Sequence, residues 1–180
     1  VQQYGQPQPV YAQVLAPAKP VVVPAPQPVR QPAPKPAPKP QPVQQQPTTT
    51  TAMPPFNKTI YVKSLHTGNF LQNDEKGHAR TVNTNKMQWE AIVIKPSSSA
   101  LGKYIITSQK NGHNLQCTSS GECLYANKNE MEWEQWSIEA HKDRFFLRSH
   151  TGKMLQVQPD GTAKCENGNK GPWEALHYEC

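Results

Sequence analysis

The sequence predicts an all-β protein: a β-trefoil of twelve short strands with pseudo-threefold symmetry, preceded by an N-terminal extended tail rich in proline. Two observations support this prediction. A block of about forty residues occurs three times after residue 56. Each copy holds four short apolar stretches separated by turn residues. Short strands at this spacing are typical of all-β barrels and sandwiches, and three copies of four strands match the trefoil.

The three copies align without gaps over their central part. Each contains a Leu-Gln pair between two glycines, then an Asn-x-Asn segment, then a Trp-Glu pair. The two sets of glycines are Gly68, Gly112 and Gly152, and Gly77, Gly121 and Gly161. We therefore predict a domain over residues 56–180, with repeats at about 58–98, 101–141 and 142–180.

The second copy illustrates the predicted strands. Its apolar stretches are residues 104–107, 114–117, 123–126 and 136–138. Gly112 and Gly121 stand between them, where a turn that needs a positive φ costs glycine little. A trefoil closes six such strands into a barrel and caps it with three hairpins, which leaves little strand edge unpaired.

The repeated tryptophans are predicted to lie in the core, because burying an indole removes roughly 150–250 Å² from water. The predicted repeat core consists of Trp89, Trp133 and Trp173, with Ile92, Trp136 and Leu176, and with Leu71, Leu115 and Leu155. Strand alternation would direct the glutamate after each Trp away from the core. There we expect it to accept a backbone N–H from the preceding Asn-x-Asn turn. The alternative is a sugar site built from an aromatic ring and a carboxylate.

Residues 1–55 form the predicted tail. They hold sixteen of the nineteen prolines, no Asp or Glu, and four cations. Closely spaced prolines favour extended polyproline II geometry, which suits either a spacer or a strand captured by a partner groove. Nucleic-acid binding is unlikely, because the cations are scattered among prolines instead of clustering with aromatic residues.

Three features indicate a secreted or cell-surface protein. Thr48, Thr49, Thr50 and Thr51 form a Thr/Pro-rich patch typical of O-glycosylated stalks, and Asn57 begins an N-glycosylation sequon. The four cysteines suit two disulfides, Cys117–Cys123 and Cys165–Cys180, although other pairings and free thiols stay open. The cysteine spacing does not match a zinc motif, so no metal is expected. No apolar run is long enough for a transmembrane segment.

The stretches "KSLHTGNFLQ", "RSHTGKMLQ" and "PWEALHY" resemble fascin-type β-trefoil modules. The resemblance covers residues 56–180 as a single trefoil. It implies the fold, and it implies as relatives fascin, which bundles actin, and hisactophilin, which binds actin and membranes. Ricin-type lectins share the fold, but their Gln-x-Trp signature does not occur in this sequence.

No catalytic pattern is present: the sequence has no G-x-S-x-G, phosphate loop or HExxH. We therefore predict a protein that is not an enzyme, with no catalytic residues and no cofactor. The leading hypothesis is an extracellular structural protein whose tail docks on a neighbouring subunit to form a filament or matrix. The first alternative is a carbohydrate-binding, lectin-like trefoil on a spacer. The second is an actin-binding fascin relative.

Overall fold

The repeated strand pattern builds twelve strands and one short 3-10 helix, and it confirms the predicted β-trefoil. The computed structural model describes residues 52–180, so residues 1–51 of the predicted tail, with Thr48–Thr51 among them, lie outside the described residues. The strands are β1 (Thr59–Ser64), β2 (Phe70–Asn73), β3 (Ala79–Asn83), β4 (Ala91–Pro96), β5 (Tyr104–Ser108), β6 (Asn114–Cys117), β7 (Cys123–Asn127), β8 (Ser137–His141), β9 (Arg144–Arg148), β10 (Leu155–Val157), β11 (Ala163–Cys165) and β12 (Leu176–Glu179), with η1 (Glu132–Glu134) before β8.

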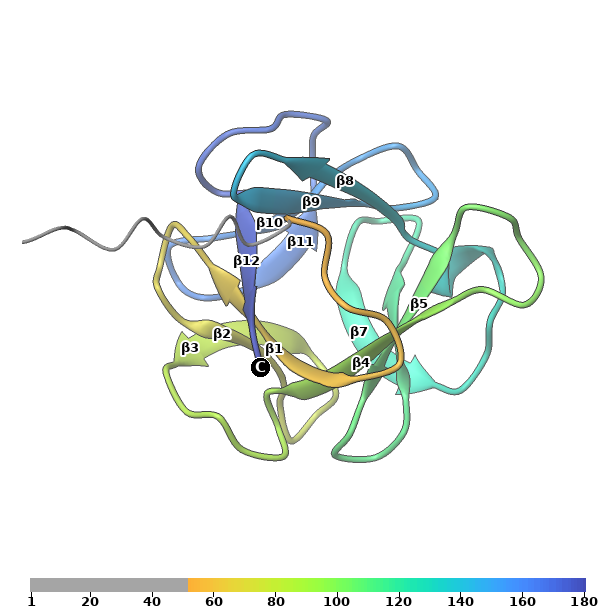
Figure 1. Cartoon of the computed structure of the whole chain (residues 1–180), viewed down its shortest axis with the longest axis horizontal. Helices are drawn as coiled ribbons and strands as arrows, with labels where there is room; N and C mark the ends of the chain where they lie inside the picture. Colours follow the sequence, from red (N-terminus) through yellow and green to blue (C-terminus); the bar gives the residue numbers. More distant parts are fainter. Residues whose placement is uncertain (1–51) are drawn as a thin grey trace, which may run out of the picture. The chain divides into compact units, whose positions relative to one another are not determined.

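Six strands close into a barrel. β1 pairs with both β4 and β12, β4 pairs with β5, β8 pairs with β9, and β9 pairs with β12, all antiparallel. The last junction joins β5 to the start of β8, where Tyr104 and Trp136 exchange backbone hydrogen bonds of 2.8 and 2.9 Å. The three repeats therefore surround a common axis, as Figure 1 shows.

The hairpins β2–β3, β6–β7 and β10–β11 cap one end of the barrel and meet at this axis. The carbonyl of each turn glycine accepts the N–H of a residue in the next hairpin: Gly77 from Tyr125, Gly121 from Cys165, and Gly161 from Thr81, at 2.7, 2.8 and 2.7 Å. All three glycines have φ between 81° and 88°, which L side chains rarely adopt. A Cβ at residue 121 would lie 2.4 Å from the Cys165 carbonyl oxygen.

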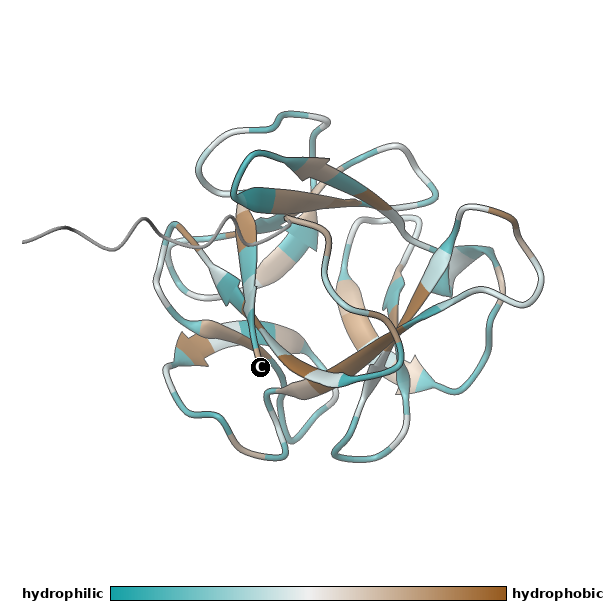
Figure 2. Ribbon diagram, in the orientation of Figure 1, coloured by the Kyte–Doolittle hydropathy of each residue, from teal (hydrophilic) through white to brown (hydrophobic). Residues whose placement is uncertain are grey.

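The core fills the barrel and the base of the hairpins. Along β1 every second residue is buried, from Ile60 to Ser64, and Figure 2 shows apolar stretches on the strands while the peripheral loops are mostly polar. Six residues predicted for the core are 0% exposed, namely Leu71, Leu115, Leu155, Ile92, Trp136 and Leu176. The Trp136 indole N–H also donates to the Leu115 carbonyl at 2.8 Å, so this large side chain is satisfied in the interior.

The other three tryptophans correct the sequence prediction. Trp133 and Trp173 are 42% and 38% exposed, and Trp89 is partly exposed, whereas the glutamates that follow them are buried. The prediction assumed strand alternation, but each Trp-Glu pair stands on a turn just before a barrel strand. In the first two repeats this turn is closed by backbone hydrogen bonds, in which the N–H of Glu90 donates to the Met87 carbonyl and the N–H of Glu134 donates to the Met131 carbonyl. A helical turn does not alternate its faces with period two.

The segment just before β1 contacts the barrel strands. The Asn57 N–H donates to the Ile94 carbonyl at 2.8 Å, and the Phe56 ring stacks on Tyr104 with centroids 4.8 Å apart. Phe56, Tyr104, Ile138 and Tyr178 are the partly buried residues that pack against the core cluster. Within residues 52–180, no helix is long and apolar enough to cross a membrane.

We predict that Gly121→Ala destabilises the protein more than Gly68→Ala. Both glycines have positive φ, 88° and 73°, but a Cβ at residue 68 would have no atom within 4 Å. Gly68→Ala should therefore cost only the backbone strain, about 1–2 kcal/mol. Gly121→Ala must also displace the Cys165 backbone, so we expect a loss of about 3 kcal/mol or more in the free energy of unfolding measured in urea. Equal losses for the two variants would contradict the proposed close approach at the axis.

Candidate functional site

Each Trp-Glu turn is held from inside by its glutamate. The carboxylates of Glu90, Glu134 and Glu174 accept the backbone N–H three residues earlier, at 3.2, 3.1 and 2.8 Å. These glutamates are 2%, 2% and 4% exposed. A glutamate that reaches back over its own turn is half of a capping box, so the carboxylate fixes the turn and the indole beside it faces outward.

An amide network supports each turn from the preceding hairpin. In the second repeat, the Asn127 side-chain N–H donates to the Gln116 side-chain oxygen at 3.1 Å, and the Asn129 backbone N–H donates to Asn127 Oδ1 at 2.7 Å. The first and third repeats contain the same bonds. The Leu-Gln and Asn-x-Asn elements of the repeat therefore build the wall against which the Trp-Glu turn lies.

Each tryptophan packs on the turn of the next repeat. The Trp133 ring lies over His150 with centroids 6.3 Å apart, and the Trp173 ring lies over His66 at 5.4 Å. Trp89 meets Lys110, whose ammonium nitrogen is 4.1 Å from the ring centroid. Since residues 66, 110 and 150 occupy the same place in each repeat, the contacts run in a closed ring around the trefoil.

Two of the three residues that lie under the indoles also bond the hairpin below. His150 Nε2 lies 3.0 Å from the Cys117 carbonyl, and Lys110 donates to the equivalent Asn73 carbonyl at 3.3 Å. These bonds hold the side chains of His150 and Lys110 in place under the indoles. This arrangement could not be predicted from the His-Thr-Gly turns, because Lys110 replaces histidine in the second repeat.

The second repeat forms a surface pocket of about 450 Å³ at its tryptophan. Its lining comprises Gln116, Asn127, Asn129, Met131, Glu132, Trp133 and Glu134. The Trp133 indole and the Glu132 carboxylate, whose side chain is 78% exposed, are open to a ligand. His150 stands behind both, with Nδ1 3.7 Å from a Glu132 oxygen.

Glu130, just before the Trp133 turn, is held by β4 and by the loop that follows it. Lys95 donates to a Glu130 carboxylate oxygen at 2.5 Å, and Ser98 donates to the other oxygen at 3.0 Å. The hydrogen bond from Lys95, followed by that from Ser98, lowers the pKa of Glu130 below its ordinary value. The residue just before the Trp133 turn therefore carries a negative charge that is already paired with a lysine.

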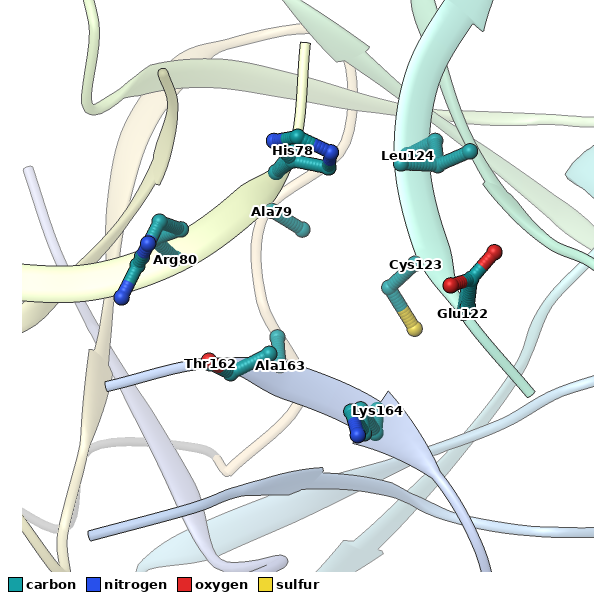
Figure 3. A pocket seen from close by; sticks show the side chains of 9 residues that line it. All are labelled: His78, Ala79, Arg80, Glu122, Cys123, Leu124, Thr162, Ala163 and Lys164. Atoms are coloured by element: carbon teal, nitrogen blue, oxygen red, sulfur yellow. The ribbon is translucent and has the colours of Figure 1, made fainter. Parts of the chain in front are cut away.

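A second hollow, of about 220 Å³, lies on the axis between the three hairpins. Ala79, Cys123 and Ala163 occupy equivalent positions on β3, β7 and β11, and they face the middle of this pocket (Figure 3). The surrounding side chains carry both signs of charge, with Arg80 and Lys164 opposed by Glu122. The first repeat adds a further hollow of about 360 Å³ beside Trp89.

The cysteines differ from the predicted disulfides, and all four are free thiols in the structure. Cys117 and Cys123 do stand opposite each other across the β6–β7 hairpin. The predicted Cys165–Cys180 pairing is wrong, because Cys180 is exposed at the chain end while Cys165 is buried at the axis. The Sγ atoms of Cys117, Cys123 and Cys165 instead lie within 4.8 Å of one another.

Comparisons with known proteins identify the fold. No family model and no curated protein matches the chain. Among solved structures, the chain is similar to the designed threefold-symmetric protein ThreeFoil, with a TM-score of 0.59, 14% identity, and coverage of 67% of this chain and 96% of that chain. It is similar to the BEL β-trefoil, with a TM-score of 0.61, 14% identity, and coverage of 72% of this chain and 99% of that chain. It is also similar to SeviL bound to asialo-GM1 saccharide, with a TM-score of 0.57, 15% identity, and coverage of 67% of this chain and 95% of that chain. The chain is therefore a β-trefoil.

We predict that Glu134→Ala destabilises the domain, whereas Glu132→Ala leaves its stability nearly unchanged. Removing the buried carboxylate leaves the Met131 N–H without its acceptor, which should cost about 1–3 kcal/mol. Glu132 lies two residues away but is exposed, so its substitution should stay within about 0.5 kcal/mol. Urea unfolding of both variants measures the difference, and an unchanged midpoint for Glu134→Ala would show that the turn needs no cap.

Proposed function

We propose that the protein is a carbohydrate-binding trefoil whose ligand sites lie at the Trp-Glu turns. The observation that carries the proposal is the exposed Trp133 indole beside a pocket lined by amides and a carboxylate. A sugar ring has a C–H face that packs on an aromatic ring and hydroxyls that bond amide and carboxylate groups. The first alternative from the sequence is thus preferred to the structural role.

The site is suited to binding because it is already rigid. Glu134 and the Gln116–Asn127 pair fix the turn, and His150 supports the indole. A ligand that stacks on Trp133 would not have to order the side chain, so less binding free energy would be lost to entropy. Glu132 and Asn129 stand at the pocket edge, where their exposed groups can meet hydroxyls.

The repeat supplies three such indoles, and this supports multivalent recognition of a surface glycan. Trp133 and Trp173 rest on histidines, whereas Trp89 rests on Lys110. The three sites therefore differ in charge, and their affinities for one sugar would differ as well. Simultaneous occupation of two or three sites raises the overall affinity without new contacts. SeviL, a trefoil of similar fold, has been solved with a saccharide bound, which makes that saccharide a reasonable first ligand to try.

We predict that Trp133→Ala weakens saccharide binding at its site at least tenfold, or about 1.4 kcal/mol. Full-length protein is applied to a glycan array that includes the asialo-GM1 saccharide, and hits are measured by calorimetry. The triple variant Trp89→Ala, Trp133→Ala, Trp173→Ala should lose all hits. Leu101→Ala is the control, because it removes a fully exposed apolar side chain that does not line the pocket. Unchanged binding by the folded triple variant, or no hit for the wild type, would reject the proposal.

The filament and matrix hypothesis remains a prediction, since residues 1–51 of its docking tail (residues 1–55) lie outside the described part of the chain. Actin binding likewise remains a prediction. A secreted or cell-surface setting is part of the proposal, because extracellular glycans would then be accessible. The secreted setting is supported by the sequon and not by the cysteines, which form no disulfide among the described residues. Asn57 is exposed in the turn before β1, with a φ of 58°.

We therefore predict N-glycosylation at Asn57 when the chain passes through a eukaryotic secretory pathway. The wild type should show a mass that decreases on treatment with a glycan-removing amidase. The Asn57→Gln variant should lack this glycan from the start, because Asn57 begins the one N-glycosylation sequon of the sequence. Absence of a shift in the wild type would remove the main support for a secreted protein.

A further inference from the structure

The three buried cysteines at the trefoil axis have no role in the Trp-Glu sites. Cys117 ends β6, Cys123 begins β7, and Cys165 ends β11. They are 0%, 3% and 0% exposed. The hairpin contact at the axis brings the third thiol to the first two, because the Cys165 N–H donates to the Gly121 carbonyl in the turn between Cys117 and Cys123.

We propose that these three cysteines form a binding site for a thiophilic metal ion, and that Cu⁺ is the ion that fits it best. The Sγ atoms all lie within 4.8 Å of one another, and the Cys123–Cys165 pair is 3.6 Å apart. With metal–sulfur bonds of about 2.3 Å, the sulfurs of a trigonal site would stand about 4.0 Å apart. The observed spacing therefore needs only small side-chain shifts.

The donor set decides the class of metal. Three sulfurs without oxygen exclude Mg²⁺ and Ca²⁺, which prefer oxygen ligands. Soft thiolates select Cu⁺, Zn²⁺ or iron–sulfur clusters. Structural Zn²⁺ takes four ligands. Among the described residues, the group of His, Cys, Asp and Glu side chains that could hold a metal ion supplies three ligands, which are these cysteines. A three-coordinate ion in a dry interior therefore favours Cu⁺.

The surroundings can support a metal-bound thiolate. The Cys123 and Cys165 thiols share a hydrogen bond of 3.6 Å, and His150 Nε2 lies 3.0 Å from the Cys117 carbonyl, so the cluster is bordered by a group that can carry a positive charge. The fully buried Tyr125 hydroxyl, two residues from Cys123, has no hydrogen-bond partner within residues 52–180.

An entry path exists along the axis. Cys123 lines the axial pocket, and its equivalents in the other two repeats are the small residues Ala79 and Ala163, so the pocket carries a single sulfur there (Figure 3). Cys117 and Cys165 lie within reach of that sulfur but do not line the pocket. Binding would form three Cu–S bonds, and each thiol that becomes a thiolate would release one proton to solvent. The copper stays Cu⁺, so no electron is transferred.

The pseudo-symmetry provides variants that should fold. The residues equivalent to Cys117, Cys123 and Cys165 in another repeat are Val157, Ala79 and Thr81. Cys117→Val, Cys123→Ala and Cys165→Thr therefore introduce side chains that the same fold already accommodates. Cys180→Ser is the matched control, because Cys180 is exposed and lies outside the group.

The test is an anaerobic titration of the reduced full-length protein with Cu⁺ in the presence of a competing chelator. The chelator becomes coloured when it binds Cu⁺, so its absorbance reports how much Cu⁺ the protein has taken. We expect one tightly bound Cu⁺ per chain in the wild type and in Cys180→Ser, and at least tenfold weaker binding in each of the other three variants. X-ray absorption should show three sulfur neighbours. A thermal melt should show stabilisation by Cu⁺ in the wild type and not in Cys123→Ala, because a ligand that binds only the folded state raises its stability.

Three results would overturn the proposal. One is Cu⁺ binding that Cys180→Ser weakens as much as Cys123→Ala does. Another is the absence of tight binding in a protein whose melting curve shows it to be folded. The third is a disulfide between two of the three axial cysteines, found by thiol counting and mass spectrometry of protein purified without reductant. None of these results bears on saccharide binding, since the Trp-Glu sites share no side chain with the axial cysteines.

Discussion

Three backbone hydrogen bonds at the trefoil axis hold the hairpins together, and much of the rest depends on them. Each runs from the N–H of one hairpin to the carbonyl of a turn glycine in its neighbour. The backbones approach so closely at Gly121 that no Cβ fits, and all three turns use positive φ. Because the hairpins are tied at these points, the axial pocket has a fixed floor and residues from separate repeats, such as Cys123 and Cys165, become neighbours.

The Trp-Glu pair combines two tasks in two adjacent residues. The carboxylate is buried and closes a turn, so the indole beside it must leave the core and rest on the following repeat. Stability and the proposed recognition thus share one motif, although different atoms serve each purpose. The arrangement also explains why the polar residues of the repeat recur as strictly as the apolar ones: Gln116 and Asn127 complete the wall against which the turn is placed.

Much of this fold could be predicted from one sequence, because glycines at turns and short apolar stretches define strands locally. The predicted β6 matches residue for residue, and the predicted β7 ends one residue early. The orientation of Trp133 could not be predicted by alternation, because a helical turn interrupts the strand pattern there. The gathering of Cys165 with Cys117 depends on contacts between repeats. Alignment of the copies held one usable signal: small alanines at 79 and 163 mark the position of Cys123 as close to the axis.

The pairing of β1 with β12 has a consequence for how the chain is made. Tyr61, in the first strand, stands opposite Glu179 in β12. During synthesis, β1 leaves the ribosome together with β2 and β4, which pair with it early, but long before β12. The barrel can close only after β12 has been made, and until then one side of β1 is an unpaired strand edge. Such an edge can pair with other chains, so the time between the synthesis of β1 and of β12 is when this fold is most open to misassembly.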